Sequence, residues 1–228
     1  MRVSGHHEPR SQRYRPPTLV QPMEGSTECL RDNVRRTAVC RTKVVRNQPI
    51  TPFSGQTREF TGAGYDKGRP ASVQVAWLAV APLFRAWFVP ARIRVAILRL
   101  FGAEIGDGVL IRHGVKIHWP WKLSIGDNTW VGEGAWILNL EPVSIGSNSC
   151  VSQDVFLCAG SHSRQSRTFE FDNGPIVIGN GVWIAARSTI LRGTSVGDHS
   201  VIGANCLVTS DVPASSIVRA PVSSIGRP

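Results

Sequence analysis

A six-residue repeat runs through the second half of the chain and constrains its fold more than any other feature. Branched aliphatic residues recur at every sixth position in four segments, and the last segment continues from Ile178 to Val208 without a gap. The fifteen positions, all Ile, Val or Leu, are 105, 111, 117, 125, 131, 137, 145, 151, 157, 178, 184, 190, 196, 202 and 208. Residues 103–214 contain 30 Ile, Val and Leu residues, so half of them fall on this one repeat.

A period of six excludes a simple helix and an ordinary strand. In a helix with 3.6 residues per turn, residues six apart would point in different directions around the helix axis. In an ordinary strand, every second residue would be equally hydrophobic, because alternate side chains share a face. Short strands joined by tight turns fit the period, with one large aliphatic residue pointing inward per step and glycine at many of the turns. Three steps make a triangular coil of about 18 residues. Stacked coils about 4.8 Å apart bury together what no single coil could bury alone.

The gaps in the repeat are also informative. The interval between repeated residues is eight at 117–125 and at 137–145, and 21 at 157–178. Each gap follows the third step of a coil, so the extra residues should leave the coils along one common edge. A long loop inside a repetitive core is usually functional, and we therefore expect an active-site loop over residues 159–176.

Charge and cysteine content exclude several classes of protein. The net charge is +10, but residues 1–70 contribute +7 of it, so the repeat region is not a basic nucleic-acid surface. A nucleic-acid binder that uses the first 70 residues is left as an alternative, which a steep salt dependence of binding would support. The five cysteines are odd in number and contain no C-x-x-C pair, which argues against a disulfide framework or a structural zinc site.

The regions outside the repeat differ from it in composition. Residues 1–68 mix Arg, Pro, Ser and Gln without a sustained apolar period, and we expect a disordered basic tail there, either dispensable or a lipid-binding or targeting arm. Residues 69–102 are apolar and arginine-rich, and we expect Pro82 and Pro90 to break them into short helices. We interpret them as an amphipathic cap on the repeat domain of residues 103–214, with a flat membrane contact through 71–101 as the alternative. Residues 215–228 are expected to be a C-terminal tail.

The repeat resembles that of the hexapeptide-repeat acyltransferases, and the motifs are most similar to the O-acetyltransferases of exopolysaccharide synthesis and to the galactoside, maltose and nodulation-factor acetyltransferases. The most specific match is the Gly-Ser-His of residues 160–162, followed by Ile-Gly-Asn-Gly-Val-Trp-Ile at residues 178–184. The resemblance spans residues 64–221. It implies an all-β, left-handed parallel β-helix of about five triangular coils, acetyl-CoA as co-substrate and no metal.

In the family the loop histidine is the general base, and the resemblance assigns this role to His162. The chemistry needs such a group, because a sugar hydroxyl is a poor nucleophile and must lose its proton as it attacks the thioester. An imidazole that titrates near neutrality suits this step, and backbone N–H groups can stabilise the oxyanion. His113, His118 and His199 fall within the regular coils, and we interpret them as surface or corner residues.

The resemblance implies further binding residues. Ala186 and Ala204 match positions that contact pantetheine through the backbone. Trp183 is expected to line the thioester channel, with a packing role as an equal alternative. Thr209 and Ser210 match a Thr-Lys pair at the nucleotide end of the ligand, but serine replaces the lysine, and Arg219 is a candidate substitute cation. Asn139 matches an asparagine that contacts the acceptor sugar, although a turn-stabilising role is an equal alternative.

These observations predict an acetyl-CoA-dependent O-acetyltransferase that acts on a sugar hydroxyl in exopolysaccharide or cell-surface glycan synthesis. The resemblance implies a homotrimer with active sites between neighbouring chains. We expect a cytoplasmic protein that does not bind nucleic acid, with peripheral contact at the inner face of the membrane left open. The alternatives are a non-glycan acceptor such as an antibiotic, a non-catalytic scaffold, and a carbonic anhydrase of similar architecture that would use His113 and His118.

Overall fold

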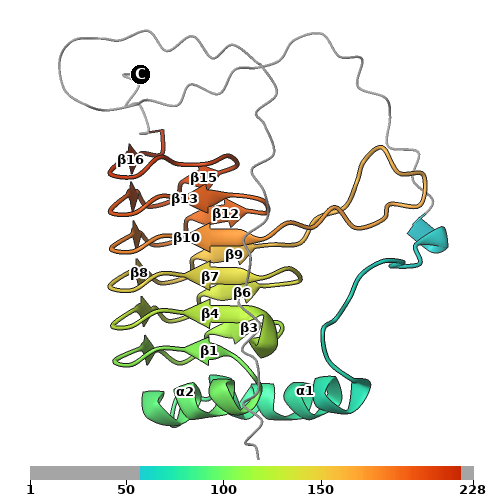
Figure 1. Ribbon diagram of the computed structural model, residues 1–228, viewed down its shortest axis with the longest axis horizontal. Coiled ribbons are helices and arrows are strands. Elements are labelled where there is room, and N and C mark those ends of the chain that lie inside the picture. The colour runs from blue at the N-terminus through green and yellow to red at the C-terminus, as the bar shows by residue number, and fades with distance from the viewer. Residues whose placement is uncertain (1–56, 222–228) are drawn as a thin grey trace, which may run out of the picture. The chain divides into compact units, whose positions relative to one another are not determined.

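The computed structural model describes residues 57–221, which form a left-handed parallel β-helix with two helices at its first coil (Figure 1). The predictions for residues 1–56 and 222–228 lie outside the described range. The helices are η1 (Thr57–Glu59), α1 (Ala71–Arg85), α2 (Ala91–Leu100) and η2 (Pro120–Lys122). The strands are β1 (Glu104–Ile105), β2 (Leu110–Ile111), β3 (Lys116–Ile117), β4 (Leu123–Ile125), β5 (Trp130–Val131), β6 (Trp136–Leu138), β7 (Val143–Ile145), β8 (Cys150–Val151), β9 (Phe156–Cys158), β10 (Ile176–Ile178), β11 (Trp183–Ile184), β12 (Thr189–Leu191), β13 (Ser195–Val196), β14 (Val201–Ile202), β15 (Leu207–Val208) and β16 (Ile217–Val218).

Each coil contributes one strand to each of three parallel sheets. The first sheet has the order β1-β4-β7-β10-β13, the second β16-β14-β11-β8-β5-β2 and the third β15-β12-β9-β6-β3. The register pairs repeated aliphatic residues of successive coils, such as Ile105 with Ile125 and Ile125 with Ile145. The predicted β-helix is therefore confirmed, with five complete coils, and β16 begins a sixth.

The repeated aliphatic residues fill the interior of the coils. All fifteen are buried, and together with the corner residues they form one continuous core. Several corner hydroxyls tie one coil to the next, because Thr129 donates to the carbonyl of Gly146 over 2.7 Å and Ser188 donates to that of Gly203 over 2.8 Å. Gly146 marks how closely the turns stack, since a Cβ there would lie 2.6 Å from the backbone of Gly179. Larger residues are excluded at such turns.

The two helices cover the first coil, and α2 contacts β1 and β2. Helix α1 continues through Pro82, so the expected break at this proline was wrong, whereas Pro90 does lie immediately before α2. Proline removes one helical hydrogen bond, but packing of the buried Trp77 and Phe84 against the core holds the last turn in place. Arg94 is buried and joins the layers, donating to the carbonyls of Phe84, Ala86 and Ile111.

The irregular segments lie on one edge of the β-helix, as the gaps predicted. Residues 118–122, 139–142 and 159–175 each connect a strand of the third sheet to the next strand of the first sheet. We call this the insertion edge. The edge between the second and third sheets has corners of four residues throughout, and we call it the regular edge.

Candidate active site

Residues 159–175 form a two-legged hairpin that projects from the insertion edge after β9 (Figure 1). Its legs are joined by backbone hydrogen bonds from Ser163 to Glu170 and from Asp172 to Ser161, both 2.8 Å long. An isolated antiparallel bridge pairs His162 with Phe171 between these two hydrogen bonds. The hairpin therefore presents His162 on a backbone with defined hydrogen bonds.

The ring of His162 is oriented by one hydrogen bond and three aromatic neighbours. Nδ1 lies 2.8 Å from the carbonyl oxygen of Phe169. A carbonyl oxygen only accepts, so Nδ1 carries the proton and the neutral imidazole has its free lone pair on Nε2. The ring stacks on Phe169 at 4.3 Å between centroids and on Phe171 at 5.1 Å, with Phe60 edge-on at 5.4 Å. This arrangement suits a general base that acts through Nε2.

The aromatic cluster around His162 extends to the corners of the coils below. Tyr65 packs against Phe171 with 4.9 Å between ring centroids, and its hydroxyl accepts a 2.7 Å hydrogen bond from Nε1 of Trp119. Trp119 belongs to the first insertion and stacks on Trp121. The segment before α1 thereby connects the hairpin to the first insertion.

Two polar contacts hold the hairpin from opposite sides. Glu170 accepts hydrogen bonds from the backbone and hydroxyl of Thr61, at 3.3 and 3.2 Å. Desolvation raises the pKa of this carboxyl, but the hydrogen bonds from Thr61, Thr168 and Gly62 outweigh it and hold the pKa below its usual value of 4.5. On the other side Arg192, at the end of β12, forms an ion pair with Asp172 and also donates to its carbonyl.

Asn139 lies on the insertion edge, in the second insertion, with none of its surface exposed. Its Oδ1 accepts hydrogen bonds from the backbone of His118 and Trp119, at 3.1 and 3.0 Å, and its Nδ2 donates to the carbonyl of Trp119. The amide therefore fixes the first insertion, which is the turn-stabilising role considered as the alternative. Contact between Asn139 and an acceptor sugar stays a prediction.

The two alanines lie together on the regular edge. Ala186 follows β11 and Ala204 follows β14, and the carbonyl of Ala186 accepts a 3.1 Å hydrogen bond from the N–H of Asn205. Trp183 stands just before this corner on the outer face of the second sheet, 52% exposed, and its Nε1 donates to the hydroxyl of Ser152. These three residues form one open strip along two coils.

Thr209 and Ser210 lie on the insertion edge, immediately after β15, and both are exposed. They share an edge with His162, but the hairpin leaves the third coil and they follow the fifth. Arg219 is exposed just after β16. A single chain thus places the alanine strip on one edge and His162 with Thr209 and Ser210 on another.

The remaining histidines of the described region do not form a metal centre. His113 lies 2.9 Å from a carboxylate oxygen of Glu133, and His118 packs edge-on against Trp119. Burial, with Lys122 and Lys67 nearby, lowers the pKa of His118. Within residues 57–221, no group of three or more His, Cys, Asp or Glu side chains is placed to hold a metal ion.

The residues that position His162 were not predicted from the sequence. Phe60 was assigned to the tail, although its ring packs against both His162 and Phe171. Phe169 and Phe171 alternate within the loop, and this period of two was a usable signal for a short strand leg. Arg192 had no signal, because its partner lies 20 residues earlier in an irregular segment.

Comparison with known proteins agrees with this architecture. The family model described as bacterial transferase hexapeptide (six repeats) matches residues 175–210, and the hexapeptide repeat of succinyl-transferase matches residues 122–159. A provisional colanic acid biosynthesis acetyltransferase of Escherichia coli, WcaF, is 41% identical over 158 residues, covering 68% of this chain and 86% of WcaF. Galactoside O-acetyltransferase of Escherichia coli is 30% identical over 123 residues, covering 53% of this chain and 61% of that protein.

Two solved structures share the fold. The hexapeptide-repeat acetyltransferase VCA0836 of Vibrio cholerae, complexed with acetyl coenzyme A, superposes with a TM-score of 0.62 at 22% identity, covering 70% of this chain and 90% of that one. A galactoside acetyltransferase in complex with coenzyme A gives a TM-score of 0.59 at 25% identity, with coverage of 64% and 75%. The match to WcaF over most of its length and the repeat common to all these proteins show that the chain belongs to the hexapeptide-repeat acetyltransferase family.

Proposed function

We propose that the protein transfers an acetyl group from acetyl-CoA to a sugar hydroxyl in exopolysaccharide or cell-surface glycan synthesis. The observation that carries the proposal is the orientation of His162, whose Nδ1–H is held by the Phe169 carbonyl so that Nε2 is free to accept a proton. The similarity to a provisional colanic acid acetyltransferase and to galactoside O-acetyltransferase supports a saccharide acceptor.

The proposed reaction is direct transfer in a ternary complex. Nε2 of His162 takes the proton of the acceptor hydroxyl as its oxygen attacks the thioester carbonyl, and a tetrahedral oxyanion forms. The intermediate collapses with cleavage of the C–S bond, and the imidazolium returns its proton to the departing CoA thiolate. The products are an acetyl ester and free CoA, and no acyl-enzyme is formed.

We further propose that the active site is shared between two copies of a homotrimer. Within one chain, His162 lies on the insertion edge and the alanine strip lies on the regular edge. In a trimer, a neighbouring copy would bring its own strip to the hairpin. The outer face of the second sheet offers an apolar contact surface, since its stacked outward residues include Trp130, Trp183 and Ile217, all substantially exposed. The outward residues of the first sheet are mostly serine by contrast, as at 124, 144 and 195.

Binding of CoA is proposed along the alanine strip. Small side chains at Ala186 and Ala204 leave the backbone accessible to the pantetheine amides, and Trp183 borders the strip. Thr209 and Ser210 are proposed at the nucleotide end, with serine in place of the lysine expected from the family. An exposed hydroxyl supplies no charge to a phosphate, so we expect weaker binding of CoA than lysine would give.

The test is acetyl transfer by the full chain to a panel of glycans, followed by mass spectrometry. His162→Ala should lower kcat by about 10²–10⁴ while CoA still binds, because a general base contributes roughly this factor. His199→Asn is the matched control, since His199 is exposed and has a φ of 58°, which asparagine tolerates. Unchanged transfer by His162→Ala would refute the assigned role, and transfer only to a non-glycan acceptor would refute the substrate class.

A further inference from the structure

The outer face of the two-helix cap is apolar and has no partner among the described residues. Apart from Arg85 at its end, the exposed residues of α1 carry no charge. They are Ala71, Ser72, Val75, Ala76, Leu78, Ala79, Pro82 and Leu83. The linker to α2 adds Trp87, 80% exposed, and Phe88, 61% exposed, and α2 adds Leu100, 83% exposed. Seven of the fourteen large exposed hydrophobic residues in the described region lie between residues 75 and 100. A patch of this kind marks an interaction site.

The charge of the cap has one sign. Residues 71–103 contain four arginines and no acidic residue, whereas residues 104–221 contain eight basic and ten acidic residues. Arg94 is buried, but Arg85, Arg92 and Arg99 are exposed. Arg99 is engaged by Asp107 at 3.3 Å, whereas Arg85 and Arg92 are the cap arginines left to contact a ligand. Positive charge is therefore concentrated where the apolar surface is exposed.

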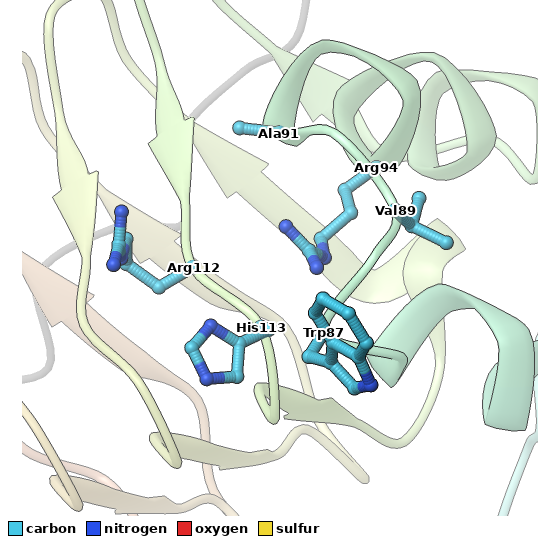
Figure 2. Close-up of a pocket in the computed structure, with 6 residues that line it drawn as sticks. All are labelled: Trp87, Val89, Ala91, Arg94, Arg112 and His113. Carbon is cyan, nitrogen blue, oxygen red and sulfur yellow. The ribbon is translucent and has the colours of Figure 1, made fainter.

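A shallow pocket adjoins the exposed linker (Figure 2). It is lined by Trp87, Val89, Ala91, Arg94, Arg112 and His113. The figure shows the side chains of Trp87, Arg94 and His113 directed toward the same space, with Arg112 beside them. Arg94 donates to three backbone carbonyls, and His113 lies 2.9 Å from a carboxylate oxygen of Glu133. Arg112 is exposed, and it is the lining residue suited to a negatively charged headgroup.

We propose that the outer face of the cap, comprising α1, the linker 86–90 and α2, docks onto an anionic phospholipid surface. The apolar residues would enter the boundary between headgroups and acyl chains, and the flanking arginines would contact lipid phosphates. Helix α1 has 15 residues and is about 22 Å long, which is less than the roughly 30 Å thickness of the hydrocarbon core of a bilayer. Its length therefore suits a helix that lies in the plane of the membrane surface. Among residues 57–221, no helix is long and apolar enough to cross a membrane.

Charge argues against the two other occupants of this face. A second cap would bring three more exposed arginines against the same surface. Residues 1–56 hold ten basic and four acidic residues, so this segment has the same sign as the cap. An anionic bilayer is the occupant whose charge complements the patch. The proposal depends on the cap alone and not on the acetyl-transfer mechanism.

The test is co-sedimentation of the full chain with vesicles of phosphatidylcholine, with and without about one third phosphatidylglycerol. We expect binding to the anionic vesicles that weakens in high salt, and about tenfold weaker binding for the double variant Trp87→Ser/Phe88→Ser. Val75→Glu should weaken binding and Val177→Glu should not, since Val75 is on the cap and Val177 is an exposed valine on the first sheet. Arg112→Gln should reduce the preference for anionic lipid.

Three results would overturn the proposal. The first is no binding by the full chain, or equal binding by the full chain and the double variant. The second is equally tight binding to vesicles of phosphatidylcholine alone. The third is a smaller oligomer in light scattering of the double variant without lipid, which would make the cap a contact between copies. Acetyl transfer to a soluble acceptor should be unaffected in these variants, so failure of docking is distinguishable from failure of the proposed function.

Discussion

The regular edge and the insertion edge are built from the same repeat but differ in the length of their corners and in the contacts that hold them. Every corner on the regular edge has four residues, and its backbone groups bond to the next coil, as Asn205 does to Ala186. The insertion edge grows from short turns at 118–122 and 139–142 to a hairpin at 159–175. Aromatic rings and ion pairs hold this edge in place of the repeat.

This difference shows how the fold accommodates a long insertion without loss of its core. The buried aliphatic residues of stacked coils stabilise the chain whatever happens at one edge, so residues can be added there without breaking the core. The added residues then adopt a conformation outside the six-residue pattern, and in the hairpin the carbonyl oxygen of Phe169 lies 2.8 Å from Nδ1 of His162. The following variants test this division from the largest expected effect to the smallest.

A core substitution should affect stability far more than one on the hairpin. Ile190→Ala in β12 removes a fully buried side chain and should lower the free energy of unfolding by about 2–5 kcal/mol. Arg164→Ala at the exposed hairpin tip should change it by less than about 0.5 kcal/mol. Urea denaturation compares the two, and similar losses would mean that the hairpin belongs to the structural core.

Loss of the hairpin anchor should lower activity without lowering stability. Arg192→Gln removes the ion pair with Asp172, and we expect kcat to fall about tenfold because His162 is less well positioned. The melting temperature should shift by only a few degrees, since the pair is partly exposed. Arg92→Gln, an exposed arginine of the cap, is the control in steady-state kinetics. A change in melting temperature without a change in kcat would contradict the anchoring role.

Removing one ring from the aromatic cluster should lower activity less than loss of the ion pair between Arg192 and Asp172. Phe171→Leu keeps an apolar side chain but loses the ring contacts to His162, Phe60 and Tyr65. We expect kcat/KM to fall about fivefold, as one stacking contact typically contributes about 1 kcal/mol. The measurement is the initial rate at saturating acetyl-CoA and varied acceptor. An unchanged kcat/KM for the acceptor would show that Phe171 does not help to position His162.

The contact between Glu170 and Thr61 should depend weakly on pH. The pKa of Glu170 is lowered in the folded chain, so the contact is complete at neutral pH and is lost as the pH falls through that lowered value, below 4.5. Glu170→Gln imitates the protonated state and should speed hydrogen exchange of the hairpin a few-fold at pH 7. Glu104→Gln, on the first sheet, is the control. Equal hydrogen exchange of the hairpin in both variants would show that Glu170 does not hold the hairpin in place.

The sequence predicted the parts of the structure that depend on repetition. Burial of all fifteen repeated residues, the three-sheet arrangement and the shared edge of the three gaps all follow from the spacing, because one large aliphatic residue must point inward at each step. Handedness came from the family resemblance and not from the spacing. The continuation of helix α1 through Pro82 was not predicted, because it depends on tertiary packing of Phe84 that outweighs one lost hydrogen bond.

The candidate site was predicted only where a local motif marks it. His162 stands in a recognisable Gly-Ser-His, but Phe60, which packs against its ring, is 102 residues away in sequence. Arg192, which pairs with Asp172 of the hairpin, is 30 residues from His162, and no period connects these positions. Asn139 also stands in a motif that suggested ligand contact; its buried amide holds the first insertion, and contact with an acceptor sugar stays a prediction. Contacts made by irregular segments depend on tertiary structure and leave little trace in a single sequence.

The most direct test of the shared active site is complementation between two defective chains. Chains carrying His162→Ala and chains carrying Ala204→Trp are co-expressed with different tags, and mixed oligomers are purified by both tags. If each site combines His162 of one copy with the alanine strip of another, every mixed trimer contains one intact site out of three. The mixed oligomers should then show roughly a third of the wild-type activity per chain. Activity no higher than that of the separate variants would show that one chain supplies the whole site and would contradict the account.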